Sequence, residues 1–463
     1  MDRTTAMEQL RYASRHTLDE DGFKNFVAMD WRSICLAKDG ELDSINQLSQ
    51  ALVTQMSAKS TCIHSVMTNL IAPFFLGSAE NSPPNLTATE KFMFEKLHAV
   101  IRDVCQLCPR SSETVCRSLC AAFPFYGTSS PHSFVCYVFN MLSVSSFLRL
   151  GEQRDAILFV LDRIYLLDVN TNLCDPDEGL HHIKLEHAVE AVISFMKSSI
   201  VVAQGVDENK ALQLYDIVFP AFMRTICPSS KTLQSMFWMF YLASMSEKVT
   251  QKFCNDMWQV FESQSVDGVR VLGLLTSFYT RSVSVVSDQV IQFLTKLANT
   301  CHEHLETVSV SDENILIEKH SRFYAAFQSL MYLIVMRSSD FPDPKILQIL
   351  QIPKLVNSRL LPLTVCPETI ADAFTRTTSQ LHITLCIPAS DQSKSVLKTD
   401  SDTTQDLWIV LHYHSEPLNM IKRRMAHLLR PITDPDVCLV DNTVRSLSFE
   451  KHWEEAGALD FDF

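Results

Sequence analysis

The chain of 463 residues has few glycines, 10 in all, and a moderate 18 prolines. So few turn-forming residues exclude collagen-like and low-complexity architectures, and they count against a many-stranded sandwich or barrel. Basic residues are also in deficit, because 40 lysines and arginines face 53 acidic residues and leave a net charge of −13. A chain this acidic has no general attraction for nucleic acid. We therefore expect no direct sequence-specific DNA binding.

Long hydrophobic runs are missing as well. The longest uncharged stretch, residues 118–148, is interrupted by Pro124, Gly127 and Pro131, so it cannot form one membrane-spanning helix. The N-terminal sequence MDRTTAMEQLRY lacks the apolar core of a signal peptide. The 14 cysteines then indicate reduced thiols that behave as small apolar residues. We expect no membrane partner and a cytosolic or nuclear location.

The motifs of common catalytic sites are absent. The nearest approach to a phosphate-binding loop, Gly268 and Gly273, is followed by Leu274 where a lysine is required, and no G-x-S-x-G elbow occurs. Two histidine pairs miss the spacings of metalloproteases: His182 with His187 beside Glu186, and His302 with His304 around Glu303. We therefore expect no enzyme activity, no catalytic residues, no cofactor and no bound metal.

Helical patterns dominate what is present. Thr87 and Glu90 have the spacing of a capping box before an apolar stripe at helical intervals. Ser130 followed by Pro131 predicts another helix start, since the hydroxyl can accept an orphan backbone N–H and proline suits the first helical position. Ser111 or Ser112 can cap the short helix between these two.

Helices of about 12 to 20 residues with short breaks continue to roughly residue 380. So many consecutive helices exceed a simple bundle, and they favour an all-α, HEAT-repeat-like α-solenoid of antiparallel helix pairs. We assign residues 1–385 to this solenoid and the polar residues 386–406 to a mobile loop. Residues 407–463 form a less regular C-terminal extension packed on it, with an acidic end.

Four cysteines fall within 16 residues. Cys105 and Cys108 form C-x-x-C, and Cys116 and Cys120 follow shortly after. Four thiolates could bind zinc, but each pair also extends the apolar stripe of a helix. Core packing is the favoured interpretation, and a zinc or thiol site stays open as an alternative.

Hydroxyl groups are dense around the predicted helix starts between residues 111 and 133. Capping and a polar helix face explain them from composition alone. A docking surface switched by phosphorylation is the functional alternative, because each phosphate adds about 1.5 to 2 negative charges. Another feature with two interpretations is the basic run Lys422-Arg423-Arg424, which is either a solvated helix face or a contact for nucleic acid or an acidic partner.

Several long blocks resemble a known family. They include VIRDVCQLCPRSSETVCRSLCAAFPF, SFVCYVFNMLSV, RDAILFVLDRIYLLDVN, SMFWMFYLASMSEKVTQKFCNDMWQVFES, HSRFYAAFQSLMYLIVMR and LQIPKLVNSRLLPLTVCPETIADAF. In this order they resemble the RNA polymerase I-specific transcription initiation factors over roughly residues 25–385. A weaker match continues at Asp434-Pro435 and at 449–453.

The resemblance implies a non-enzymatic HEAT-repeat adaptor in the nucleus and nucleolus, with a cytoplasmic pool. Such a factor binds RNA polymerase I through a serine-bearing surface, bridges it to the promoter-bound selectivity (core) factor at ribosomal RNA genes, and is regulated by kinases. Carried onto this chain, the polymerase-binding surface is Ser111, Ser112, Ser118, Ser129, Ser130 and Ser133. The promoter-factor contact is Lys354, Asn357, Ser358, Arg359 and Leu360. We expect the serine hydroxyls to face solvent.

The sequence also departs from the family pattern. A long acidic, serine-rich loop of the family is reduced here to SAENSPPN, and an aromatic tail motif appears as PITDP without its phenylalanines. A generic HEAT-repeat scaffold or a nuclear transport adaptor remains the alternative function, with the serines then serving only as helix caps.

Overall fold

The computed structural model describes twelve stretches of the chain. They are residues 3–35, 41–77, 86–171, 179–229, 232, 234–263, 268–308, 315–341, 345–366, 368–381, 397–398 and 418–430. The chain forms two compact units. Unit 1 comprises Met1–Ala243 with Pro417–Arg424, and unit 2 comprises Ser244–Glu416 with Met425–Phe463.

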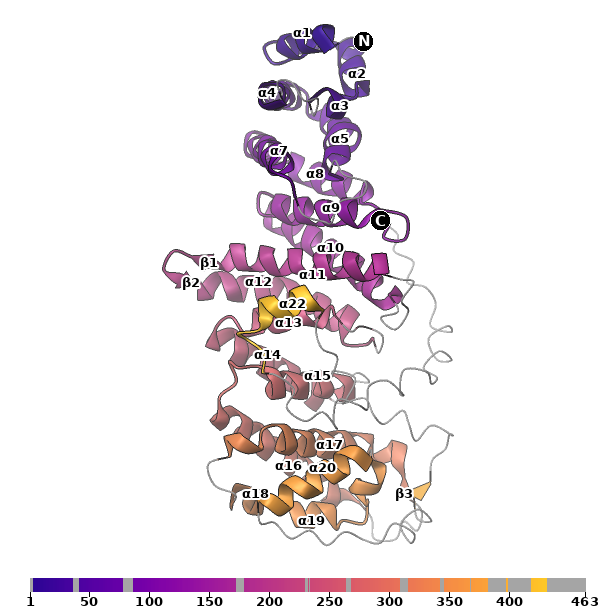
Figure 1. Cartoon of the computed structure of the whole chain (residues 1–463), viewed down its shortest axis with the longest axis vertical. Coiled ribbons are helices and arrows are strands. Elements are labelled where there is room, and N and C mark those ends of the chain that lie inside the picture. The colour runs from indigo at the N-terminus through magenta and orange to yellow at the C-terminus, as the bar shows by residue number, and fades with distance from the viewer. Residues whose placement is uncertain are drawn as a thin grey trace. The chain divides into compact units, whose positions relative to one another are not determined.

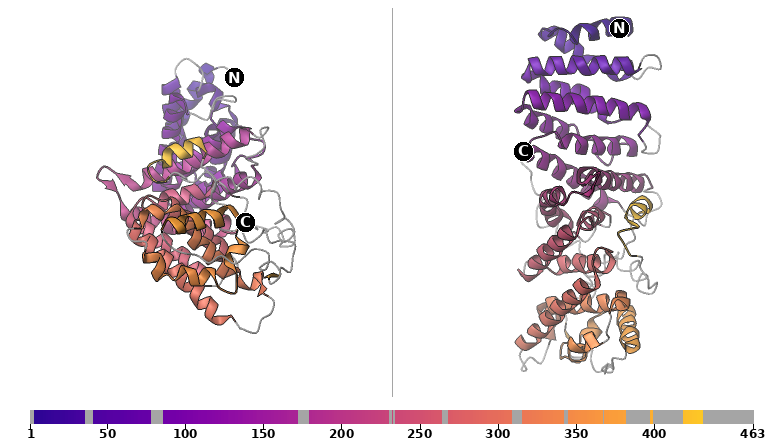
Figure 2. Two further views of the ribbon diagram at one scale, coloured as in Figure 1. Left: turned by 60° about the horizontal axis from the view of Figure 1, so that its bottom comes forward. Right: turned by 90° about the vertical axis from the view of Figure 1, so that its left-hand side faces the viewer.

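Unit 1 is a succession of helices that pack on their neighbours in the order of the sequence (Figures 1 and 2). Its elements are α1 (Arg3–Ala13), α2 (Glu20–Ala28), α3 (Trp31–Cys35), α4 (Glu41–Ala58), η1 (Ser60–Cys62), α5 (Ile63–Val66), η2 (Met67–Ile71), α6 (Ala72–Phe75), α7 (Ala88–Leu107), α8 (Ser111–Ala121), α9 (Pro131–Ser145), α10 (Leu150–Asn170), α11 (Gly179–Ile200), α12 (Glu208–Ala221), η4 (Phe222–Ile226) and α13 (Met236–Ala243). A two-residue hairpin, β1 (Val201–Val202) and β2 (Gly205–Val206), joins α11 to α12.

Unit 2 is also built mainly of helices. Its elements are α14 (Glu247–Glu262), α15 (Gly268–Arg281), α16 (Ser287–Thr307), β3 (Ile315–Leu316), η5 (Ile317–His320), α17 (Ser321–Met336), η6 (Ser338–Asp340), α18 (Lys345–Ile349), α19 (Ile352–Val356), η7 (Pro362–Val365), α20 (Glu368–Gln380) and β4 (Leu397–Lys398). The helix α17 packs against α15, α16 and α20 and forms the centre of the unit. A last helix, α22 (Asn419–Met425), begins in unit 1 and ends in unit 2.

The expected all-α solenoid of antiparallel helices is confirmed within each unit. The only strands in the described stretches are two-residue pairs, of which β3 and β4 lie parallel. Strand β4 falls inside the predicted polar loop 386–406, and the rest of that loop lies outside the described residues. Of the C-terminal extension, the structure describes residues 418–430 only.

Two predicted helix starts are confirmed. Thr87 and Glu90 form the capping box of α7: Thr87 Oγ1 accepts from the Glu90 N–H at 3.2 Å, and Glu90 Oε2 accepts from the Thr87 N–H at 2.8 Å. Ser130 caps α9 by accepting from the Ser133 N–H at 3.1 Å, with Pro131 at the first helical position. The third start is wrong, because the N-cap of α8 is Arg110, which makes no side-chain cap, and both Ser111 and Ser112 lie inside the helix.

Long-range polar side chains satisfy helix ends that no local residue caps. At the start of α13, whose eight residues are all buried, Asp168 of α10 accepts from the N–H groups of Gln234 at 3.1 Å and Ser235 at 2.7 Å. In unit 2, the buried guanidinium of Arg337, at the end of α17, donates to the carbonyls of Tyr279 and Val285 and pairs with Asp340. Each contact satisfies backbone or carboxylate groups that would otherwise be desolvated without a partner.

We expect Arg337→Met to destabilise unit 2, because it leaves two buried carbonyls without this donor and weakens the pairing of Asp340. The loss should be about 2 kcal/mol or more, measured as a shift of the urea-induced unfolding transition followed by circular dichroism. Arg15→Met removes an exposed arginine and serves as the control, with an expected change within about 0.5 kcal/mol. An equal, small shift in both variants would contradict the structural role of Arg337.

Candidate interaction surfaces

The connector between α8 and α9, residues 122–130, is held in place by a lysine from α11. The Nζ of Lys184 donates to the carbonyl oxygens of Tyr126 and of Ser129, the latter at 2.8 Å, and lies 5.8 Å from the centre of the Phe134 ring. The Lys184 side chain is buried, and this desolvation lowers its pKa. The connector is therefore a fixed element of unit 1, although it has no regular secondary structure.

The two phenylalanines that flank Pro124 in the connector have opposite roles. Phe123 packs edge-on against the rings of Phe134 and Tyr137, with centroid distances of 5.5 and 5.1 Å. Phe125 is 60% exposed. Proline restricts the residue before it to extended conformations, and the short F-P-F turn thus supplies one anchor to the core and one apolar group to the surface.

Other exposed apolar side chains lie where α11 meets the connector. Leu180 and Ile183 are exposed and lie within one helical turn of Lys184, which binds the connector backbone. Phe125 of the connector and these two residues of α11 are thus exposed apolar side chains on segments that Lys184 joins. Sequence reasoning missed these residues; the F-P-F turn and the pair of apolar residues beside His181 and His182 were the available signals.

Three of the predicted surface serines lie in the connector or in the first turn of α9. Ser129, Ser130 and Ser133 are half-buried, and Thr128 next to them is exposed. The Ser130 hydroxyl donates to Ser133 Oγ at 3.0 Å while it caps α9. The Oγ of Ser129 is buried and has no hydrogen-bond partner in the structure.

The other three serines are not at the surface. Ser111, Ser112 and Ser118 are 5%, 1% and 0% exposed, so the expectation that their hydroxyls face solvent is wrong. Ser112 Oγ accepts from the Arg149 N–H at 3.0 Å. Ser118 Oγ donates to the Thr114 carbonyl at 2.6 Å and lies 2.8 Å from His64 Nδ1.

The reason for this burial is the position of α8. This short helix packs against α5, η2, α7 and α10, so little of its surface is left for solvent. Ser111 and Ser118 stand four residues before and three residues after Val115, on the face that carries the core residues. Small side chains on that face let the neighbouring helices approach closely.

The four cysteines of the predicted cluster do not all converge: Cys116 and Cys120 are in side-chain contact, but no three of the four thiols form one group in the described residues. Cys105 and Cys116 are buried, and Cys108 and Cys120 are half-buried. In the part of the chain that the structure describes, the one group of metal-ligating side chains whose donor atoms come together is a different one, Glu90, His132 and Cys136. The favoured interpretation of the cysteines as packing residues agrees with this placement.

The predicted promoter-factor residues belong to a tight segment, residues 352–360. It consists of α19 and the turn after it, and residues with positive φ flank it: Gln351 at 52° and Leu361 at 45°. Non-glycine residues in this left-handed region cost of order 1 kcal/mol or more, and such strain is found at functional sites more often than elsewhere. The segment is therefore held in one shape by its surroundings.

The segment presents part of the predicted contact and buries the rest. Lys354, Asn357 and Arg359 are exposed, whereas Ser358 is half-buried. Leu360 is fully buried, and its carbonyl accepts from the Tyr324 hydroxyl at 2.8 Å. Leu360 is thus the residue that fixes the turn to the core, and a contact through its side chain is wrong.

One residue of the basic run on α22 forms an ion pair within unit 1. The Arg424 Nε donates to Glu190 Oε1 of α11 at 2.7 Å, and the Met420 N–H donates to Glu186 of the same helix. Lys422 and Arg423 are exposed. Glu186, a residue of the near-miss histidine motif, therefore serves as a docking point for α22.

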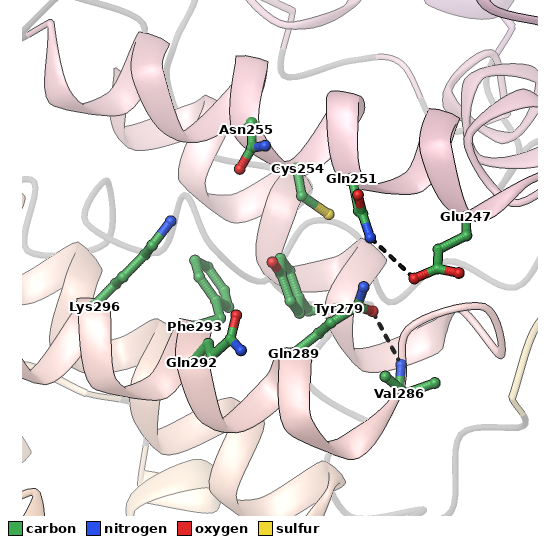
Figure 3. Close-up of a pocket in the computed structure, with 10 residues that line it drawn as sticks. All are labelled: Glu247, Gln251, Cys254, Asn255, Tyr279, Val286, Gln289, Gln292, Phe293 and Lys296. Carbon is green, nitrogen blue, oxygen red and sulfur yellow. Dashed lines mark hydrogen bonds between the residues drawn. The ribbon is translucent and has the colours of Figure 1, made fainter.

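A groove of about 380 Å³ lies between α14, α15 and α16 (Figure 3). Glu247 and Lys296 stand at its opposite ends, and the ring of Tyr279 stacks on Phe293 at 4.1 Å between them. Burial raises the pKa of the Cys254 thiol to about 12 and raises that of the Tyr279 hydroxyl as well. Both groups remain protonated near neutral pH, so neither supplies a nucleophile or a general base there.

Substitution by aspartate separates buried from accessible hydroxyls. We expect Ser112→Asp to destabilise unit 1 by about 2 kcal/mol or more, because it buries a carboxylate in place of a small neutral group. Thr128→Asp, at an exposed position of the connector, should change the stability by less than about 0.5 kcal/mol. Thermal unfolding followed by circular dichroism checks both. A Ser112→Asp protein as stable as the wild type would show that this hydroxyl is accessible.

None of the helices in the described stretches combines the length and the apolar character needed to cross a bilayer. Comparison with known proteins identifies the chain more directly. The family model described as "RNA polymerase I specific transcription initiation factor RRN3" matches residues 27–190 and 179–427. A crystal structure titled "Crystal Structure of RNA Polymerase I Transcription Initiation Factor Rrn3" has the same fold, with a TM-score of 0.70 and 16% sequence identity over 93% of this chain and 94% of that chain.

Two curated relatives carry the name "RNA polymerase I-specific transcription initiation factor RRN3". The protein of Mus musculus is 20% identical over 385 residues, which cover 70% of this chain and 58% of the relative. The protein of Saccharomyces cerevisiae is 18% identical over 245 residues, or 48% of this chain and 38% of the relative. This chain thus aligns with little more than half of the mouse protein. The family is described as a transcription initiation factor and not as an enzyme, and its model matches most of the sequence: the chain belongs to the RNA polymerase I-specific transcription initiation factor RRN3 family.

Proposed function

We propose that this chain is an RNA polymerase I transcription initiation factor that binds the polymerase and bridges it to the promoter-bound selectivity (core) factor at ribosomal RNA genes. The match to the family model over residues 27–190 and 179–427 carries this proposal. A factor that acts at ribosomal RNA genes would act in the nucleus and nucleolus, and the proposal includes a cytoplasmic pool of the protein. The net charge of −13 supports binding through protein partners and not through direct sequence-specific contacts with DNA.

The polymerase contact in this proposal is the connector edge of unit 1: Phe125, Thr128, Ser129, Ser130, Ser133, Leu180 and Ile183. Exposed aromatic side chains such as Phe125 are enriched at protein interfaces. The buried Lys184 side chain binds two carbonyls of the connector backbone. A contact that is already ordered before binding loses less conformational entropy when the partner arrives.

Phosphorylation by regulatory kinases would act at this edge. Thr128 is exposed and Ser130 and Ser133 are half-buried, whereas the hydroxyl of Ser129 and the side chains of Ser111, Ser112 and Ser118 are buried in the described structure. A phosphate on Ser130 or Ser133 would stand at the N-terminus of α9, where negative charge is favourable for the helix. Its effect would then fall on the partner, through the desolvation and repulsion of about two added negative charges.

The promoter-factor contact in this proposal is the exposed side of residues 352–360. Lys354 and Arg359 give this segment positive charge on an otherwise acidic chain, and Asn357 adds a hydrogen-bonding group. Such a segment suits an acidic patch of a protein partner. The two flanking left-handed residues keep the basic groups on a turn of fixed shape.

We expect Phe125→Ser combined with Leu180→Ser to reduce the capture of RNA polymerase I by at least tenfold, because it removes the apolar centre of the connector edge. Affinity purification from nuclear extract of the source organism, with polymerase subunits identified by mass spectrometry, measures the effect. Tyr12→Ser, which replaces another exposed aromatic residue of unit 1, is the matched control and should capture polymerase normally. Undiminished capture by the double variant would remove the connector edge from the interface. Capture of transport receptors in place of polymerase by the wild-type chain would overturn the proposed function itself.

Charge reversal tests the second contact. Lys354→Glu combined with Arg359→Glu should weaken recruitment of the promoter selectivity (core) factor severalfold and leave polymerase capture unchanged. Lys319→Glu, at an exposed position of unit 2, controls for a general effect of added negative charge. Loss of both partners together would contradict separate contact sites, and wild-type recruitment of both would exclude this segment.

A further inference from the structure

Three side chains with metal-ligating atoms meet in the interior of unit 1. Glu90 lies in the first turn of α7, and His132 and Cys136 lie one turn apart on α9. All three are at most 1% exposed. The His132 Nε2 atom is 2.8 Å from Glu90 Oε1 and 3.3 Å from Cys136 Sγ, and the donor atoms lie within 4.8 Å of one another. We refer to these residues as the buried trio.

Hydrogen bonding alone does not satisfy the buried trio. One ring nitrogen faces both a carboxylate oxygen and a sulfur, and it has a single in-plane position for a proton. The other ring nitrogen, Nδ1, is buried without a hydrogen-bond partner in the structure. Such an arrangement in a native interior needs an explanation, and a bound ion is one of the usual ones.

The surroundings orient the donors toward one another. Glu90 Oε2 accepts from both the N–H and the hydroxyl of Thr87, at 2.8 and 3.0 Å, which leaves Oε1 facing His132. Metal-binding carboxylates are commonly held by such outer hydrogen bonds. On the other side, Gly77 passes close by with φ at +73°, and a Cβ at this position would lie 2.5 Å from His132 Nε2 and 2.9 Å from Cys136 Sγ. Only glycine therefore fits at residue 77, and any larger residue there would push against two of the donor atoms.

We propose that Glu90, His132 and Cys136 form a binding site for a thiophilic divalent cation, with Zn²⁺ as the best match. A thiolate, an imidazole and a carboxylate are the three ligand types that zinc takes in proteins, whereas Mg²⁺ and Ca²⁺ prefer oxygen atoms. Binding releases the thiol proton of Cys136 to solvent and forms a metal–sulfur bond. The ring proton of His132 moves from Nε2 to Nδ1, so that Nε2 can bind the metal while the imidazole stays neutral. The resulting set of one dication, one thiolate, one carboxylate and one neutral imidazole carries no net charge, which suits a buried position.

The geometry needs only a small adjustment. Zinc bond lengths of about 2.0 to 2.3 Å with tetrahedral angles place neighbouring donor atoms about 3.4 to 3.6 Å apart. The two separations from His132 Nε2, 2.8 and 3.3 Å, must therefore lengthen by roughly half an ångström. The third separation, between the Glu90 and Cys136 donors, is within 4.8 Å and must come to about 3.6 Å. Rotation about the side-chain bonds of Glu90 and Cys136 supplies such a shift without movement of the helices. The site joins the start of α7 to the start of α9 and leaves a fourth position for water.

The test uses the full chain stripped of metal by dialysis against a chelator and then titrated with Co²⁺, a spectroscopic substitute for zinc. We expect one equivalent to bind with the visible bands of tetrahedral cobalt and an ultraviolet thiolate-to-cobalt charge-transfer band, and we expect Zn²⁺ to displace it. Saturation at 100 times the dissociation constant should add about 2.7 kcal/mol to the stability of the protein, seen as a higher thermal midpoint. Absence of the charge-transfer band at saturating Co²⁺ would overturn the proposal.

Variants assign the ligands. Cys136→Ser should abolish the charge-transfer band, and Glu90→Gln should weaken Co²⁺ binding at least tenfold while the band from the thiolate remains. Cys254→Ser, at a buried cysteine of α14, is the matched control and should bind Co²⁺ like the wild type. Cys105→Ser with Cys108→Ser distinguishes the buried trio from the four-cysteine cluster. Loss of the charge-transfer band in the Cys105→Ser, Cys108→Ser variant would place the metal elsewhere and overturn the proposal. Persistence of the band in Cys136→Ser would do the same. If a variant does not fold, the Co²⁺ titration of the wild-type protein still tests the proposal.

Discussion

The buried ends of helices set the main constraint on this structure. Each helix leaves N–H and C=O groups without partners inside the helix, and packing against neighbours removes the water that would otherwise satisfy them. Residues far away in sequence meet this need at several places. Asp168 accepts hydrogen bonds at the start of α13. Lys184 donates to carbonyls of the connector, and Arg337 donates to a carbonyl near the end of α15. These few buried charged groups determine where adjoining segments can lie, and the apolar faces then fill the space between them.

Local patterns were sufficient to predict the class of fold and two helix starts. The capping box of Thr87 and Glu90 and the Ser130-Pro131 start depend on residues within four positions of each other, so their chemistry is visible in the sequence. Ser111 and Ser118 lie on the same face of α8 as Val115, although hydroxyl groups by themselves predict surface residues. A serine costs little to bury once its hydroxyl finds a backbone or side-chain partner, as Ser118 does with Thr114 and His64.

Long-range features could not be predicted in the same way. Lys184 stands among histidines and a glutamate in HHIKLEH, a segment that resembles a solvated helix face. Its burial follows from the connector, which comes 55 to 58 residues earlier in the chain. Leu360 likewise sits in a basic, polar turn and is nevertheless a core residue, because Tyr324 of α17 binds its carbonyl. The exposure of Phe125 also depends on long-range packing, because Phe123 occupies the core position beside Phe134 and Tyr137.

The division between buried and exposed groups narrows how an adaptor of this family can be regulated. A kinase needs a hydroxyl that can enter its active site, and a buried serine such as Ser112 meets this condition only if α8 separates from α10. The connector has accessible hydroxyls on a backbone that Lys184 already holds, so modification there changes the surface and leaves the core intact. Glu90 illustrates the opposite case. Its one oxygen caps α7 and its other oxygen faces His132, so a change at this carboxylate alters a helix start and the joint between α7 and α9 together. A group with two structural roles is a poor site for regulation, whereas charge added at the exposed Thr128 of the connector alters neither role.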